Sequence, residues 1–390
     1  MAHNSQIQKI SEMGTKLHRS GCAPYKIEKY IQYYAKKHDV TVIVQATPTA
    51  ITYQFPDNGN QVIMNRLEPA SINLALLANT IIRINQPNDM TPPEPVNYPA
   101  WLTMLANIAI PPAFLVLVGS SIQTIFIAAL LGFMVWACQL LCRNERIILV
   151  EFLSAFVTGL TVAWISSHGV PLPVWGLCIA AIVLFIPGLS IANSLECLAF
   201  NDLLSGTSLF GQSIFIFMKL FIGILIGLSV GENFWGATQS IENINEVAFW
   251  MPYIALPALS FAIGIIFNAR MIDILLAIPV TILGMWGPLY LDFGAGWIVG
   301  TWITTICITL YGTWLAKKLN LTGAIYIVQG VIILVPGSRI LMGATQSLFG
   351  ETLMSAPSIG LSALFIFSAI VAGQITAYSF YSQKNRKLIS

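Results

Sequence analysis

Four residues in the last third of the chain could bind a carboxylate. Pro336 and Gly337 follow a strongly apolar run, and Ser338 and Arg339 come directly after them. Proline lacks a backbone N–H and glycine tolerates most backbone angles, so the pair interrupts a helix and leaves N–H groups free at the start of the next one. Those N–H groups, the Ser338 hydroxyl and the forked Arg339 guanidinium are donors that suit an anion.

The same interruption occurs earlier, where Pro187 and Gly188 end another apolar run. The two proline-glycine pairs align within an internal repeat. Ser190 and Asn193 follow the first pair and could hydrogen-bond an amino or hydroxyl group. Either pair alone could be a simple helix kink, since glycine and proline are common in membrane helices. Two interruptions at corresponding positions favour a substrate site near the middle of a membrane.

Charged residues near these motifs have two interpretations each. Lys219 lies inside an apolar run, so it either contacts substrate or forms a buried ion pair, with Glu196 or Asp202 as the simplest partner. Glu196, Asp202 and Glu351 are candidates for proton coupling, or else solvated carboxylates at helix ends.

The composition places the chain in a membrane. Hydrophobic residues make up 56% and charged residues 9% of the 390 residues, and the mean hydropathy is +0.74. From residue 100 onward, ten apolar runs are long enough to span a bilayer, which takes about 20 residues each. Their approximate limits are 100–119, 121–141, 147–167, 174–195, 207–231, 249–268, 271–291, 294–316, 322–347 and 355–381.

Lysine and arginine predict the orientation of these runs. They accumulate on the cytoplasmic side of membrane proteins, and here they fall in alternate connections and in the C-terminal tail, at Arg143, Arg146, Arg270, Lys317, Lys318, Lys384, Arg386 and Lys387. Both termini are therefore expected in the cytoplasm. Five helices per repeat would make the two halves enter the membrane from opposite sides, which predicts an inverted repeat of about 99–231 and 249–382.

The first quarter of the chain differs in character. Residues 1–99 hold 9 of the 19 lysines and arginines and 7 of the 17 acids, so a cytoplasmic α+β domain over 1–98, ending in a proline-rich linker, is expected before a transport domain over 99–390. Its pattern predicts helices near 5–20, 23–37 and 69–84, and short strands broken at Pro48 and at 56–60. Catalytic groupings are absent from its sequence, so we interpret it as a gate or assembly module.

The stretch GCAPYKIEKYIQYYAKKHDV (21–40) and the motifs at Ile186–Leu189 and Leu334–Ser338 resemble the threonine/serine exporter family over nearly the whole chain. The resemblance implies an exporter of small amino acids in the bacterial inner membrane, or of a small dicarboxylate such as succinate. The implied partners are the small-molecule substrate and the lipid bilayer, with a second copy of the chain as a further candidate.

Two other classes stay open on the sequence. A channel for small carboxylates would use a similar interrupted helix, although channels more often repeat between subunits than within one chain. An enzyme would need a nucleophile, an acid-base pair or a metal site, and His168 is the single histidine after residue 99. We therefore expect no catalytic residue, no cofactor, no metal and no nucleic-acid partner.

Overall fold

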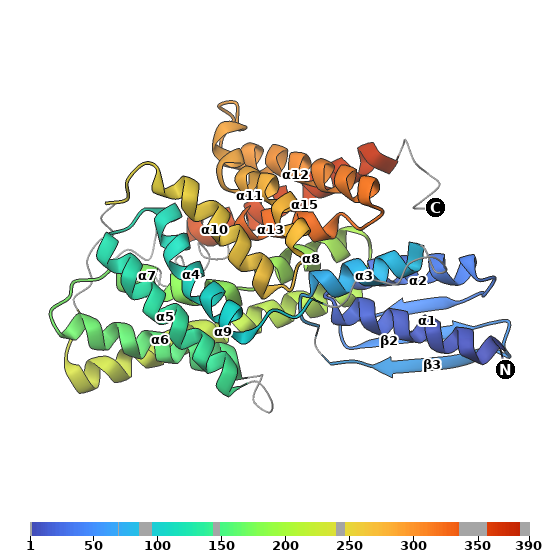
Figure 1. The fold of residues 1–390 in the computed structure, drawn as a ribbon, viewed down its shortest axis with the longest axis horizontal. Coiled ribbons are helices and arrows are strands. Elements are labelled where there is room, and N and C mark those ends of the chain that lie inside the picture. Colours follow the sequence, from blue (N-terminus) through green and yellow to red (C-terminus); the bar gives the residue numbers. More distant parts are fainter. Residues whose placement is uncertain are drawn as a thin grey trace.

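The computed structural model describes residues 2–68, 70–85, 96–142, 149–238, 246–334 and 357–382. Its N-terminal part consists of α1 (Ala2–Arg19), α2 (Pro24–Lys37), β1 (Ile43–Ala46), β2 (Ala50–Phe55), β3 (Gln61–Arg66) and α3 (Leu74–Asn85). The predicted helices and strands are therefore confirmed, although α3 begins five residues later than predicted. Figure 1 shows this part on one side and the apolar helices on the other, with α8 near the junction.

The three strands form an antiparallel sheet in the order β1-β2-β3. The sequence permits such short connections because Pro48 lies between β1 and β2, and the turn at 56–60 joins β2 to β3. Side chains alternate between buried and exposed along β2, where Ile51, Tyr53 and Phe55 are at most 1% exposed. One face of the sheet thus packs against the helices, as is usual for an antiparallel sheet.

The remaining elements are helices: α4 (Ala100–Val118), α5 (Ile122–Leu141), α6 (Val150–Ser167), α7 (Val174–Ala181), the 3-10 turn η2 (Val183–Phe185), α8 (Gly188–Ala199), α9 (Leu203–Trp235), α10 (Met251–Ile266), α11 (Met271–Tyr290), α12 (Trp297–Leu319), α13 (Ala324–Leu334) and α15 (Pro357–Ser382). Among the described residues, six of these helices are long and apolar enough to cross a membrane. The α7–α8 pair makes a seventh if its two parts are counted as one bent span. The number of ten spans stays a prediction.

Several helix contacts recur at corresponding places of the two segments in which the sequence predicts a repeat. Helix α6 packs on α9 and α12 packs on α15, and these helices occupy corresponding places in the two segments. The pairs α4 with α5 and α10 with α11 correspond in the same way, and α4 also packs on α10 across the two segments. The two segments therefore share their pairwise contacts.

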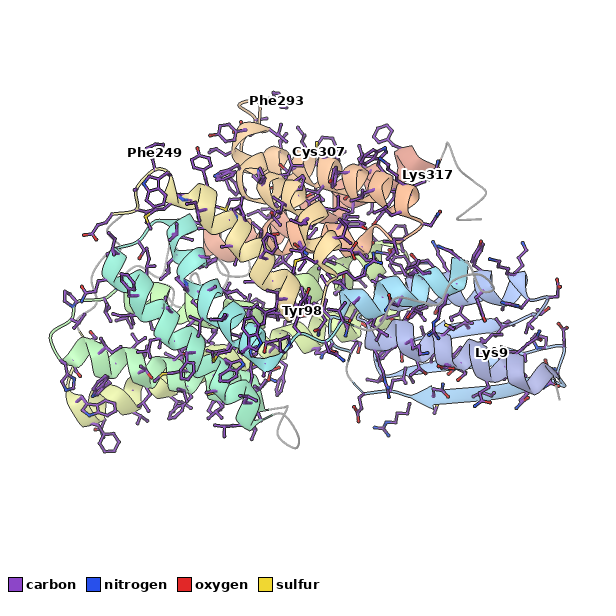
Figure 2. All side chains as sticks on the ribbon, viewed as in Figure 1. Lys9, Tyr98, Phe249, Phe293, Cys307 and Lys317 are labelled. Atoms are coloured by element: carbon purple, nitrogen blue, oxygen red, sulfur yellow. The ribbon has the colours of Figure 1, made fainter. Side chains whose placement is uncertain are left out.

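Exposed aromatic side chains mark the connections that lack lysine and arginine. Phe249 and Phe293 are 85% and 78% exposed and project outward from the helical part, whereas Lys9 lies in the N-terminal part (Figure 2). Aromatic residues are enriched where membrane proteins meet the membrane surface. Because such residues occur at both membrane surfaces, they do not distinguish the two sides, and the orientation expected from the charge pattern stays a prediction.

The N-terminal part is joined to the helical part by a shared core. Its buried cluster includes Ile27, Ile31 and Tyr53 and continues into Leu315 and Tyr326 of α12 and α13. Backbone hydrogen bonds add to this contact, since the N–H groups of Leu74 and Ala75, at the start of α3, donate to the carbonyls of Phe267 and Asn268.

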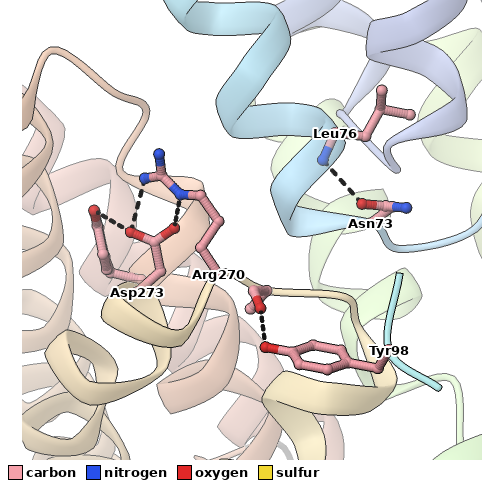
Figure 3. Close-up of polar contacts among 7 residues, drawn as sticks. Asn73, Leu76, Tyr98, Arg270 and Asp273 are labelled. Atoms are coloured by element: carbon pink, nitrogen blue, oxygen red, sulfur yellow. Dashed lines mark hydrogen bonds and ion pairs between the residues drawn. The ribbon is translucent and has the colours of Figure 1, made fainter. Parts of the chain in front are cut away.

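The α10–α11 turn lies at the same junction (Figure 3). Arg270 binds Asp273 through two hydrogen bonds of 2.6 and 3.0 Å, and Tyr326 donates to the same carboxylate at 2.9 Å. The Tyr98 hydroxyl donates to the Ala269 carbonyl at 2.8 Å. Arg270 and Asp273 thus form an ion pair within the first turn of α11, and Tyr326 links the pair to α13.

Candidate functional site

The first proline-glycine motif interrupts a helix, as predicted. Helix α7 ends at Ala181, η2 follows, and α8 begins at Gly188 with Pro187 at its N-cap. The two helical parts meet at an angle of 59°. Because proline cannot continue the hydrogen-bond ladder, the direction of the chain changes here, and α8 then packs against α13 and α15 of the second segment.

A small cavity lies where these helices meet the N-terminal part. Its volume is about 30 Å³, which is about the space that one water molecule takes in the liquid. Its lining comes from four helices: Lys26 of α2, Ala192, Asn193 and Glu196 of α8, Ala324, Ile327, Val328 and Val331 of α13, and Gln374 and Tyr378 of α15. Both segments and the N-terminal part therefore contribute residues to one cavity.

Glu196 is the centre of charge in this cavity. It is 2% exposed, so the interpretation of Glu196 as a solvated helix-end carboxylate is wrong. Its partners come from α2: the Tyr25 hydroxyl donates to Oε1 at 2.5 Å, and Lys26 Nζ lies 3.0 Å from the same oxygen. Tyr25 in turn stacks on Phe200, with ring centroids 5.0 Å apart. The N-terminal part thus supplies the groups that neutralise a buried carboxylate.

Electrostatics keep Lys26 protonated. Burial is the largest single influence on Lys26 and opposes its charge, but the Glu196 carboxylate, Tyr25 and Tyr378 together outweigh burial and raise the pKa of Lys26 well above its usual range. Burial raises the pKa of Tyr25, so its hydroxyl keeps its proton and remains a hydrogen-bond donor. Glu196 lies near the C-terminal end of α8, where the helix dipole favours a positive charge.

Two amide side chains complete the polar lining. Asn193 is half-buried and stands one turn before Glu196 on α8. Gln374 is 6% exposed, and among the described residues its Oε1 has no hydrogen-bond partner. A buried acceptor without a donor is unfavourable by about 1–3 kcal/mol. The cavity therefore offers an acceptor to a ligand that carries N–H or O–H groups.

The other predicted residues of the first motif have varied surroundings. Pro187 and Gly188 are buried at the start of α8, and Ser190 is half-buried in its first turn. Asp202 caps α9, where its carboxylate accepts from the Ser205 N–H at 3.2 Å. The cap is a sufficient structural role for Asp202, whereas Asn193 and Glu196 line the cavity.

Lys219 lies elsewhere. Its Nζ is 3.1 Å from Glu151 of α6, so the expectation that Glu196 or Asp202 would be its partner is wrong. The reason is the helix arrangement: α6 packs along α9, while Glu196 faces α2. The role of Lys219 in substrate binding stays a prediction.

The second motif lies outside the described residues, and α13 ends at Leu334, just before it. The predicted residues that belong to it are Pro336, Gly337, Ser338, Arg339 and Glu351.

Four polar residues of the site were not among the predicted ones. Tyr25 and Lys26 lie in the helix predicted over 23–37, and nothing in their spacing indicates a partner 171 and 170 residues away. Gln374 and Tyr378 carried a weak signal, because a glutamine within the apolar run FSAIVAGQITAY stands out in a membrane helix.

Comparison with known proteins agrees with the resemblance inferred from the sequence. Residues 89–231, which contain the first proline-glycine motif and the helices around it, match the model of a family described as "Putative threonine/serine exporter". No curated protein and no solved structure matches the chain. The description of the matched family is that of an exporter. The match covers less than half of the chain and shows that residues 89–231 are similar to an exporter family, while the apolar helices are typical of a multi-pass membrane protein.

Proposed function

We propose that the protein exports threonine and serine from the cytoplasm across the bacterial inner membrane by alternating access. The observation that carries the proposal is the family match over 89–231, which covers the whole first segment of the transport domain. The corresponding helix contacts in the two segments support a repeat, which is the architecture from which many secondary transporters obtain alternating access.

The cavity at α8, α13 and α15 is the place where the two segments would move relative to each other. It is enclosed by elements of both segments, and its polar lining faces apolar residues of α13. A cavity of about 30 Å³ holds water but not an amino acid. Substrate entry requires α8 and α13 to separate.

The predicted substrate-binding residues divide between the two helix interruptions. Pro187, Gly188, Ser190 and Asn193 would bind substrate at the first one. At the second one, Pro336, Gly337, Ser338 and Arg339 would hold the substrate carboxylate. Export against a gradient requires an energy source. Glu196, Asp202 and Glu351 are the candidates for proton coupling, and the burial of Glu196 in the cavity lining supports it over the described Asp202.

Counterflow in proteoliposomes tests the proposal. Vesicles containing purified protein and unlabelled threonine should accumulate labelled threonine or serine, but not labelled succinate, above the level of protein-free vesicles. Accumulation of succinate alone would replace the amino acids with a dicarboxylate, and flux without counterflow would indicate a channel. Asn193→Leu should slow threonine counterflow, whereas Gln123→Leu, an exposed position on α5, should not.

A further inference from the structure

The primary ammonium group of Lys26 forms an ion pair with the Glu196 carboxylate. Its Nζ lies 3.0 Å from Oε1 and 3.4 Å from Oε2 of the carboxylate. The group is chemically of the same kind as the α-ammonium of an amino acid, with three N–H donors and one positive charge. It reaches the cavity on the end of a side chain of α2, which belongs to the N-terminal part and not to the transport helices.

The α2 side chains also occupy the space beside Glu196. Tyr25 and Lys26 both contact the carboxylate, and the remaining cavity has room for about one water molecule. An amino acid could therefore reach Glu196 only after Lys26 has left. The Lys26 ammonium and a substrate ammonium cannot occupy this position together.

We propose that Glu196 is the subsite for the substrate ammonium, and that Lys26 fills this subsite until an amino acid displaces it. This inference rests on the proposed function, since it concerns the binding of an amino acid in the same cavity. The exchange keeps the charge constant, because one ammonium group replaces another on a buried carboxylate. Glu196 is never left unpaired, a condition that costs several kcal/mol in a buried pair.

The proposal also decides between the two substrate classes. Succinate has no ammonium group to replace Lys26, and it would bring two further negative charges beside Glu196. An amino acid satisfies Glu196, and the orphan Oε1 of Gln374 can accept from its ammonium or from the hydroxyl of threonine or serine. The C-terminal end of α8 favours a cation at the same place.

Displacement of Lys26 would release α2 as well. Lys26 and Tyr25 hold the N-terminal part to α8 through Glu196, so a bound amino acid removes one of these contacts. The N-terminal part would then respond to occupancy of the transport site, acting as a gate on its cytoplasmic side. A ligand can shift such an equilibrium because it binds the released form alone.

Ligand binding to the intact protein gives the first test. Thermal shifts of the wild type in detergent should be largest for threonine, should persist for threoninol, which keeps the ammonium and lacks the carboxylate, and should vanish for 3-hydroxybutyrate, which lacks the ammonium. Equal shifts for threonine and 3-hydroxybutyrate would overturn the proposal. Because the comparison uses wild-type protein, it does not depend on the folding of a variant.

Two variants give the second test. Lys26→Met removes the competing ammonium, so the apparent Kd for threonine should fall at least severalfold, while Lys36→Met, an exposed position on the same helix, should leave it unchanged. If Lys26 only stabilised the fold, Lys26→Met would instead raise the apparent Kd for threonine, because the site would be less well formed. Glu196→Gln should abolish the preference for threonine over 3-hydroxybutyrate.

The outcomes separate this inference from the proposed function. If the wild type transports threonine but Lys26→Met does not bind it more tightly, Lys26 does not occupy the ammonium subsite and the export function still stands. If Glu196→Gln keeps its preference for threonine over 3-hydroxybutyrate, the ammonium subsite lies elsewhere. If the wild type transports neither threonine nor serine, both proposals fail.

Discussion

Lys219 of α9 lies 3.1 Å from Glu151 of α6, and both side chains are 19% exposed. The pair joins the two helices that make the most extensive contact in the fold. Removing one partner of a buried ion pair costs about 3–5 kcal/mol, because the other charge is left uncompensated. We therefore expect Lys219→Met to lower the Tm of the purified protein strongly.

The double variant Lys219→Met with Glu151→Gln should recover most of this loss, since it leaves no unpaired charge. If it also transports threonine at the wild-type rate, Lys219 serves the structure. Full stability with lost transport in both variants would instead restore Lys219 as a substrate-binding residue.

Glycines set the close approach of α6 and α9. A Cβ at Gly227 would lie 2.3 Å from the Phe156 carbonyl oxygen, which is far inside contact distance, whereas a Cβ at Gly211 of the same helix meets nothing within 4 Å. Gly227→Ala should lower stability by about 1–3 kcal/mol, because the helices must separate. Gly211→Ala should raise it by up to about 1 kcal/mol through helix propensity. Thermal unfolding of both variants checks this, and equal effects would contradict the packing.

The raised pKa of Glu28 predicts that the stability of the N-terminal part depends on pH. Burial raises the pKa of this carboxyl, the bond from the Ala46 N–H opposes the rise, and the Asp202 carboxylate adds to it. A folded-state pKa above the unfolded value means that ionisation destabilises the fold, so the stabilising contribution is present at acidic pH and is lost as the pH rises through the folded pKa. Glu28→Gln keeps the acceptor for Ala46 and should raise the Tm at pH 7, but not at pH 4.

Glu12 serves as a control, because its pKa is shifted in the opposite direction and its effect on stability should change with pH in the opposite way. The hydrogen bond and charge of Lys16 lower the pKa of Glu12, so its contribution is present above the unfolded pKa and is lost as the pH falls through the folded one. Glu12→Gln should therefore lower the Tm slightly at pH 7, because this pair is half-exposed. A higher Tm for both variants at pH 7 would contradict the assignment.

Local patterns predicted the elements of this protein well. The interruption at Pro187 and Gly188 and the turn at 56–60 depend on residue types that restrict the backbone in any context. The helices around them follow from apolar length, although α10, with 16 residues, is shorter than the predicted span 249–268.

Partners of charged residues were not predictable in this way. Glu196 binds Lys26 because α8 packs near α2, and Lys219 binds Glu151 because α9 packs on α6. The spacing of residues in the sequence does not indicate which helices pack together. The sequence identified Asn193 and Glu196 as candidates because polar groups inside apolar helices require a partner. It could not show that the partner of Glu196 comes from the N-terminal part.

Arg339 is the remaining cation for the substrate carboxylate. It directly follows Pro336, Gly337 and Ser338 in the sequence, where a helix start would orient N–H groups toward an anion but disfavour a resident cation, so that Arg339 requires an anionic partner. If this anion is the substrate, Arg339→Lys should weaken the apparent affinity for threonine severalfold, because lysine lacks the bidentate fork. Arg339→Gln should nearly abolish threonine counterflow in protein that is still folded and inserted.

Threoninol distinguishes binding of the substrate carboxylate from binding of the substrate ammonium group in this experiment. Since it lacks a carboxylate, its binding should be unaffected by Arg339→Gln, whereas the binding of threonine should fall to the level of threoninol. Glu196→Gln should weaken both ligands, because both carry the ammonium group. If Arg339→Gln lowers the affinity for threoninol as much as that for threonine, Arg339 supports the fold of the second motif, and the carboxylate is bound by another group.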